Sequence, residues 1–255
     1  MGLRAFAAVV AAILLSLPPA GRAADYPLQF YTEEYPPITF SRAGKAAGLA
    51  TDIVEEIMRR TGIAAPIEVV PWARAYKLAT TGPNVGLFAT TRTEEREKLF
   101  KWVGPISATT AHFYSRKGAP IYDTLEQARR AERILIPREW YLQQMLRGLG
   151  FTNIHGVATP VEAVKMLAAG RATVMALDDV TLADTLNATG VSAADIQSGG
   201  TITQAIQYIA FSRDTPDELV QLFQRTLDTM KADGTYDRIY TKWLPGVKPP
   251  VAMRR

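Results

Sequence analysis

The stretch AAGRATVMALDD, residues 168–179, combines a helix end, a buried strand and a polar strand terminus. Gly170 closes the helical pattern before it, since glycine commonly ends helices. Residues 172–177 are apolar except for one threonine, which is typical of a parallel strand covered on both faces. Asp178 and Asp179 follow at once, so two carboxylates stand at the carboxyl end of this strand. The stretch therefore predicts an α/β fold.

The same alternation of apolar runs and amphipathic segments extends in both directions. Thr51 can cap a helix that buries one apolar face and ends at Gly62, and Thr159 with Glu162 forms a capping box. Short apolar segments between such helices are typical of β-α-β units, which build mostly parallel sheets flanked by helices. The strands that this pattern predicts are 28–31, 66–70, 85–89, 133–136, 172–177 and 206–211.

Composition excludes several classes of site. The 255 residues contain no cysteine and two histidines, so disulfides and thiolate metal sites are excluded, and no His/Glu cluster has metal-ligand spacing. The formal net charge is +4, but lysine and arginine are scattered along the chain, which argues against nucleic-acid binding. We expect neither a metal nor a cofactor.

The N-terminal segment has the pattern of an export signal. Arg4 precedes an apolar run over residues 5–17, which is shorter than the roughly 20 residues of a membrane span. Small residues then lead to Ala23, near which we expect signal peptidase to cut. Residues 1–23 are thus predicted to be a signal peptide, with an uncleaved anchor as the alternative. No cysteine follows, so a lipoprotein anchor is excluded.

Polar clusters follow three of the predicted strands, where ligands bind in open α/β sheets. They are residues 32–37, residues 90–96, and the pair Asp178 and Asp179. Each cluster has a structural alternative, because threonines and aspartates cap helices and glutamates solvate loops. Together, a guanidinium, threonine hydroxyls, a carboxylate and an aromatic cover such as Tyr35 or Trp72 would recognise a zwitterion.

Five motifs in order resemble solute-binding protein family 3, the polar amino-acid-binding periplasmic proteins of ABC importers. They are EEYPPITF (33–40), GLATDIVEEIMRRTG (48–62), TRTEEREKLFKWVGPI (91–106), AAGRATVMALDD (168–179) and TMKADGTYDRIYTKWLP (229–245). The resemblance implies a type II periplasmic binding protein, with two α/β lobes joined by two crossover strands. Residues 25–111 plus 208–251 would form lobe 1, residues 114–207 lobe 2, and the crossovers would lie near 112–116 and 206–213.

The resemblance also implies a function. The chain would be a monomeric periplasmic protein without enzyme activity. It would capture an amino acid or analogue between its lobes and deliver it to an ABC permease in the inner membrane. Relatives that resemble cyclohexadienyl or arogenate dehydratases leave an enzyme as an alternative, with Glu33, Glu34, Glu139 or Asp179 as the acid. A periplasmic sensing or accessory module is a further alternative.

Site residues follow from the motifs. The resemblance implies that Arg96 clamps the ligand carboxylate with help from Thr91, that Asp178 takes the ammonium group, and that Tyr35 packs on the side chain. The chain departs from the family at residues 136–141, IPREWY, where a Gly-Thr-rich turn is usual, and this leaves open whether the ligand is an α-amino acid. The predicted ligand-binding residues are Arg96, Thr91, Asp178, Tyr35, Glu34, Trp72, Arg74 and Trp140.

Overall fold

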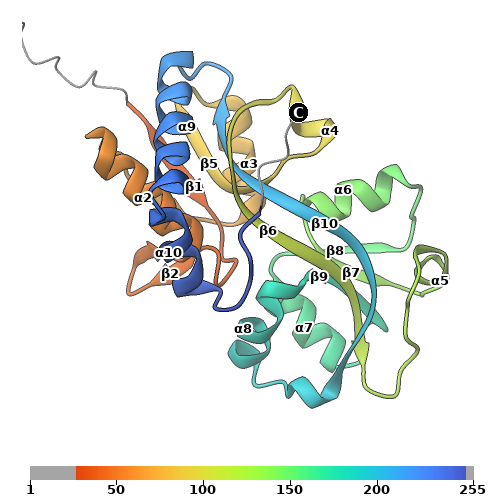
Figure 1. The fold of residues 1–255 in the computed structure, drawn as a ribbon. Coiled ribbons are helices and arrows are strands. Elements are labelled where there is room, and N and C mark those ends of the chain that lie inside the picture. The colour runs from red at the N-terminus through yellow and green to blue at the C-terminus, as the bar shows by residue number, and fades with distance from the viewer. Residues whose placement is uncertain (1–26, 251–255) are drawn as a thin grey trace, which may run out of the picture.

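Two α/β lobes share one continuous sheet in the computed structural model (Figure 1). The structure describes residues 27–250, so the predicted signal peptide lies outside the described residues. The elements up to the middle of the chain are β1 (Gln29–Thr32), β2 (Phe40–Arg42), β3 (Lys45–Ala47), α2 (Leu49–Thr61), β4 (Ile67–Val69), α3 (Trp72–Thr81), β5 (Val85–Thr91), α4 (Glu94–Glu97), β6 (Phe100–Arg116) and α5 (Leu125–Arg129). The remaining elements are β7 (Ile134–Pro137), α6 (Tyr141–Gly148), β8 (Ile154–Val157), α7 (Pro160–Ala168), β9 (Val174–Asp178), α8 (Asp179–Thr189), η2 (Ala193–Asp195), β10 (Ile196–Ser212), α9 (Asp217–Ala232) and α10 (Thr235–Trp243).

The strand order defines the lobes. The eight-stranded sheet runs β4-β1-β5-β10-β6-β9-β7-β8. We call β4, β1 and β5 with α2, α3, α4, α9 and α10 the first lobe, and β9, β7 and β8 with α5 to α8 the second lobe. Within the eight-stranded sheet the short strands of each lobe pair in parallel, while β6 and β10 pair antiparallel to their neighbours. The short strands β2 and β3 form a separate antiparallel pair. The predicted two-lobed type II architecture is confirmed.

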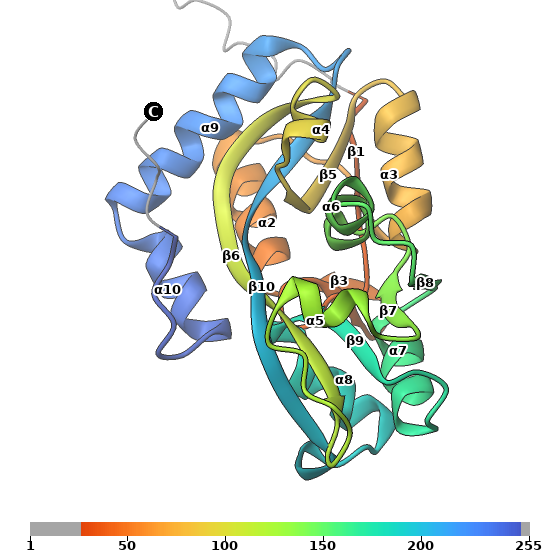
Figure 2. The same cartoon turned by 90° about the vertical axis from the view of Figure 1, so that its right-hand side faces the viewer.

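The long strands β6 and β10 run side by side through both lobes (Figures 1 and 2). β10 pairs with β5 over residues 207–211, and β6 pairs with β9 over residues 111–114. Between these regions, residues 108–110 and 204–206 pair only with each other. This two-stranded connection lies a few residues earlier on both strands than the crossovers expected from the sequence. The lobe boundaries given above stay a prediction.

Helix ends follow local chemistry, with shifts from the predicted positions. Gly62 ends α2 in the left-handed conformation, at φ 71°, as glycine permits. The helix begins at Leu49, and the Thr51 hydroxyl bonds to the carbonyl of Ala47, so Thr51 is not the cap that its sequence suggested. The Thr159 cap is confirmed, since its hydroxyl accepts the N–H of Glu162.

Buried apolar side chains fill both lobes. In the first lobe, Phe30 packs edge-on against Phe88 and Phe211, and Phe223 of α9 covers them. A separate cluster in the second lobe surrounds Phe113. These cores hold each lobe as a rigid layer structure, so that the strand ends facing the other lobe are fixed in place. No helix within residues 27–250 is long and apolar enough to cross a membrane.

Candidate functional site

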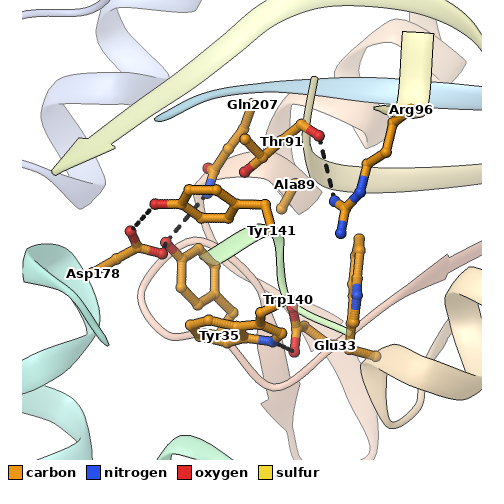
Figure 3. Close-up of a pocket in the computed structure, with 10 residues that line it drawn as sticks. Glu33, Tyr35, Ala89, Thr91, Arg96, Trp140, Tyr141, Asp178 and Gln207 are labelled. Atoms are coloured by element: carbon orange, nitrogen blue, oxygen red, sulfur yellow. Dashed lines mark hydrogen bonds between the residues drawn. The ribbon is translucent and has the colours of Figure 1, made fainter. Parts of the chain in front are cut away.

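One cavity lies between the lobes, at the carboxyl ends of β1, β5 and β9 (Figure 3). Its volume is about 20 Å3, which is room for about one water molecule. The lining residues are Glu33, Tyr35, Trp72, Ala89, Thr91, Arg96, Trp140, Tyr141, Asp178 and Gln207.

Arg96 provides the cation of the cavity. It lies on α4, directly after β5, and is 1% exposed. The guanidinium rests over the rings of Trp72 and Tyr76, with its carbon 5.3 and 5.0 Å from the ring centres. Burial lowers the pKa of Arg96, but an arginine stays protonated at any physiological pH. The site therefore holds a permanent positive charge that little water reaches.

The hydrogen bonds of Arg96 reach both lobes. Nη1 donates to the carbonyl of Thr91 at 3.4 Å, within the first lobe. Nη2 donates to the carbonyl of Glu139 at 2.8 Å, and Nε donates to Oε1 of Gln144 at 3.0 Å; both partners belong to the second lobe. Three of the five N–H groups thus have protein partners, which leaves two that can serve a ligand.

The turn before α6 brings the carbonyl of Glu139 to this place. Glu139 has φ 61°, a left-handed conformation that is uncommon for a residue other than glycine. Its N–H donates to Oε1 of Gln143 at 3.0 Å. Its carbonyl accepts a second bond from the indole N–H of Trp72, also at 2.8 Å. The carbonyl is therefore shared by two donors of the opposite lobe.

Asp178 provides an acid at the other side of the cavity. It ends β9 and is 1% exposed. Tyr141 donates to one carboxylate oxygen and Tyr35 to the other, both at 2.7 Å (Figure 3). Gln207 of β10 donates to the Tyr35 hydroxyl at 3.2 Å. The bond from Tyr35 crosses between the lobes, whereas Tyr141 lies in the same lobe as Asp178.

Burial sets the protonation of this acidic side. It raises the pKa of Asp178, and the hydroxyls of Tyr141 and Tyr35 oppose that shift by donating to the charged form. Burial also raises the pKa of both tyrosines well above the usual range, and the adjacent Asp178 charge adds to the effect. Both hydroxyls therefore keep their protons and act as donors throughout the physiological range.

Glu33 is a second acid, placed directly after β1. Its Oε2 accepts the indole N–H of Trp140 at 2.9 Å, and the Trp140 ring stands edge-on to Tyr35 with ring centres 5.3 Å apart. Burial raises the pKa of Glu33 to about 8, against the opposing effect of the Trp140 bond. At neutral pH this carboxyl group is therefore mostly protonated and can donate a hydrogen bond.

A second hollow adjoins the cavity through Glu33 and Trp72, which line both. Its volume is about 130 Å3. Valine and proline side chains from both lobes form its walls, and Glu34 lies at its edge. Together the two spaces combine a charged inner part with an apolar extension that carries carboxylates.

The structure brings together six of the eight residues predicted for the ligand: Arg96, Thr91, Asp178, Tyr35, Trp72 and Trp140. Glu34 lines only the adjoining hollow, where it is exposed and accepts the N–H of Ser41. Arg74 is exposed on α3 and does not line the cavity. Thr91 reaches Arg96 through its main-chain carbonyl. The ligand-binding roles of these residues stay predictions.

Sequence reasoning missed Tyr141, Gln207 and Ala89, and treated Glu33 as an alternative. Tyr141 stands in the IPREWY segment that departs from the family, and this departure is a signal that could have drawn attention to it. Gln207 lies within the strand predicted over residues 206–211, but that prediction did not bring its side chain to the site. Within residues 27–250, no three His, Cys, Asp or Glu side chains lie close enough together to hold a metal ion.

Comparisons with known proteins agree with this geometry. The model of the bacterial extracellular solute-binding proteins, family 3, matches residues 29–246. Among solved structures, a histidine kinase sensor domain with similarity to periplasmic binding proteins has a TM-score of 0.82 at 21% identity, covering 90% of this chain and 100% of that one. No curated protein sequence matches the chain.

Two reconstructed ancestral proteins are also similar. An ancestral arginine-binding protein bound to arginine has a TM-score of 0.75 at 22% identity, covering 85% of this chain and 97% of that one. The ancestral amino acid-binding protein AncCDT-1, a precursor of cyclohexadienyl dehydratase, has a TM-score of 0.72 at 21% identity, covering 85% and 94%. At these identities the structural likeness shows the fold alone.

Proposed function

The chain belongs to the bacterial extracellular solute-binding proteins of family 3, and on this premise we propose that it binds an amino acid or close analogue between its lobes. One observation carries the proposal. A buried guanidinium, Arg96, and a buried carboxylate, Asp178, line the same cavity, one from each lobe. A zwitterion can bond to both charges at once and so favours the closed arrangement of the lobes.

Each charge matches one group of an amino acid. The two N–H groups of Arg96 without a protein partner can hold a carboxylate, and a guanidinium pairs with carboxylates more strongly than a neutral donor does. Asp178 accepts one bond at each oxygen, and a carboxylate has further lone pairs for an ammonium group. Tyr35 offers a ring surface to the remainder of the ligand.

Charge balance favours a ligand with a cationic side chain. Burial keeps Glu33 mostly protonated at neutral pH, but the other two acids, Glu34 and Asp178, still outnumber Arg96 among the residues that line the cavity and its adjoining hollow. The apolar walls of the hollow suit an alkyl chain, and its two carboxyl groups can accept hydrogen bonds from an ammonium or guanidinium end. The ancestral arginine-binding protein with the same fold binds such a molecule. We therefore infer that L-arginine or a similar basic amino acid is the ligand.

Delivery to an importer completes the proposed role. We expect the exported protein to act in the periplasm as a monomer and to present its ligand to an ABC permease in the inner membrane. Uptake of labelled ligand by cells with and without the gene for this chain tests that step. Normal uptake in its absence would contradict the transport role while leaving binding intact.

Calorimetry tests the binding itself. We expect the purified protein to bind a basic amino acid saturably, without turnover. In a thermal-shift screen over amino acids, polyamines and organic acids, occupancy stabilises by RT ln(1 + [L]/Kd), so micromolar ligands become visible. The proposal fails if no zwitterion in the screen raises the melting temperature.

A dehydratase is the second candidate, and the raised pKa of Glu33 favours it. A carboxyl group with a pKa of about 8 is protonated at neutral pH and can act as a general acid toward a departing hydroxyl group. AncCDT-1, which shares the fold, is a precursor of cyclohexadienyl dehydratase. Incubation with prephenate or L-arogenate decides the matter, because formation of an aromatic product that Glu33→Gln abolishes would establish an enzyme.

A further inference from the structure

Contacts between the lobes concentrate on two successive residues, Glu139 and Trp140. The Glu139 carbonyl accepts from Arg96 and from Trp72, both at 2.8 Å. The Trp140 indole N–H donates to Glu33 at 2.9 Å. All three bonds cross from the second lobe to residues of the first. Figure 3 shows the Trp140 ring beside Tyr35 and Glu33, within the cavity.

These two residues present the same chemistry that a ligand would. A carbonyl oxygen held by a guanidinium and an indole N–H stands where one oxygen of a carboxylate would be held. An N–H directed at Glu33 stands where an N–H donor at the basic end of the ligand side chain would be held. Trp140 is 4% exposed, so its ring also takes up space that a ligand side chain would need.

We propose that Glu139 and Trp140 act as a built-in occupant of the cleft, which holds the lobes together and which a ligand displaces. The inference rests on the proposed function, because it assigns a competitor to the same site. It also narrows the ligand class. A displacing molecule must supply an acceptor for Arg96 and Trp72 and a donor for Glu33, so a zwitterion fits and a simple monocarboxylate does not.

Competition of this kind lowers the apparent affinity. Only the fraction of molecules in which Glu139 and Trp140 have left the cleft is ready to bind, and the apparent Kd equals the intrinsic Kd divided by that fraction. Removing the occupant should therefore tighten binding. A tryptophan that only packs on the ligand would have the opposite effect, since its removal would weaken binding.

The distance between the lobes, measured without any ligand, tests whether Glu139 and Trp140 hold the lobes together. The chain has no cysteine, so Lys77→Cys on α3 and Lys165→Cys on α7, both exposed, accept two spin labels in an otherwise unlabelled protein. We expect a narrow distance distribution in this parent and a longer, broader one after Trp140→Ala. An unchanged distribution in the Trp140→Ala protein would overturn the proposal.

A matched tryptophan serves as the control. Trp102 donates its indole N–H to the carbonyl of Glu97 within the first lobe, outside the cavity. Trp102→Ala should leave the distance distribution as in the parent. If Trp140→Ala does not fold, Trp140→Phe keeps a ring and removes only the N–H, and it should broaden the distribution to a smaller extent. Identical distributions for Trp140→Phe and the parent would then count against the proposal.

Affinity provides the second test, with L-arginine as the probe in calorimetry. Trp140→Ala should lower its Kd about tenfold, and Trp102→Ala should not change it. A raised Kd in the Trp140→Ala protein would overturn the proposal that Trp140 competes with the ligand, and would identify Trp140 as a ligand contact. If L-arginine binds neither the wild type nor the variant, the ligand assignment fails, and the spin-label distances alone decide whether Glu139 and Trp140 hold the lobes together.

Discussion

The two sides of the cavity hold their charges in different ways. Arg96 is held largely by main-chain carbonyls and by aromatic faces, and two of its three hydrogen bonds go to the opposite lobe. Asp178 is held by two tyrosine hydroxyls, one from each lobe. Arg96 stays charged at any accessible pH, whereas burial has moved the pKa of both acids, Asp178 and Glu33, upward.

This difference separates two tasks. The cationic side provides a constant charge, and two of the three hydrogen bonds of Arg96 would break if the lobes separated. The acidic side can be tuned by pH and by the ligand, because its protonation is adjustable. A single cavity therefore combines a fixed electrostatic anchor with groups that respond to their surroundings. Five substitutions, taken from the largest expected effect to the smallest, test whether the sides behave in this way.

Arg96→Ala should cause the largest loss. Removing one partner of a buried charge contact costs about 3–5 kcal/mol, so the affinity for L-arginine should fall by two orders of magnitude or more in calorimetry. Circular dichroism checks that the variant folds. Arg74→Ala removes an exposed arginine of the same lobe and should bind as the wild type does. Unchanged affinity in the Arg96→Ala protein would show that Arg96 does not bind the ligand.

Glu33 should make stability depend on pH. The pKa of Glu33 is about 8 in the folded protein and 4.5 in the unfolded chain, so the carboxyl group ionises in the unfolded chain first. Its contribution to the free energy of unfolding is therefore complete below pH 4.5 and is lost as the pH rises to 8. The free energy of unfolding in urea should fall by about 3 kcal/mol more between pH 5 and pH 8 in the wild type than in Glu33→Gln. Equal slopes for the wild type and Glu33→Gln would mean that Glu33 is ionised in the fold.

Asp178→Asn should discriminate between ligands. Loss of the negative charge should weaken the binding of L-arginine by about 2 kcal/mol. The binding of 5-guanidinopentanoate, the analogue without the α-amino group, should weaken much less. Calorimetry with both ligands measures the difference. Asp179→Asn is the control, because Asp179 is exposed and accepts the main-chain N–H groups of Thr110 on β6 and Val180 on α8. Equal losses for the two ligands would show that Asp178 does not meet the amine.

Substitution of Tyr141 or Tyr35 should have the smallest effect, on the free energy of unfolding for Tyr141 and on the distance between the lobes for Tyr35. Tyr141→Phe removes a bond within the second lobe and should lower the free energy of unfolding by about 1 kcal/mol in urea. Tyr35→Phe removes the bond between the lobes and should mainly widen the spin-label distance between positions 77 and 165. If both variants change only the unfolding free energy, the bond from Tyr35 does not hold the lobes together.

Much of the architecture was predictable because it depends on local patterns. Apolar runs such as residues 172–177 mark buried strands wherever they fold, and the polar residues after them, including Asp178 and Arg96, come to the sheet edge for the same reason. The long strands β6 and β10 were predicted only in part. Their residues change from buried to partly exposed where only two strands bridge the lobes, so no single period runs through them.

The contacts within the site depended on tertiary structure. Tyr35 and Asp178 are 143 positions apart, so nothing in their own segments indicates that they meet. The Glu139 carbonyl has no side-chain signature, since every residue has a main-chain oxygen and only the left-handed turn brings this one to Arg96. Local periodicity thus decided the elements and the sheet edge. The packing of the two lobes against each other decided which groups share a cavity and how far burial moves their pKa values, because burial and contact exist only once distant segments have met.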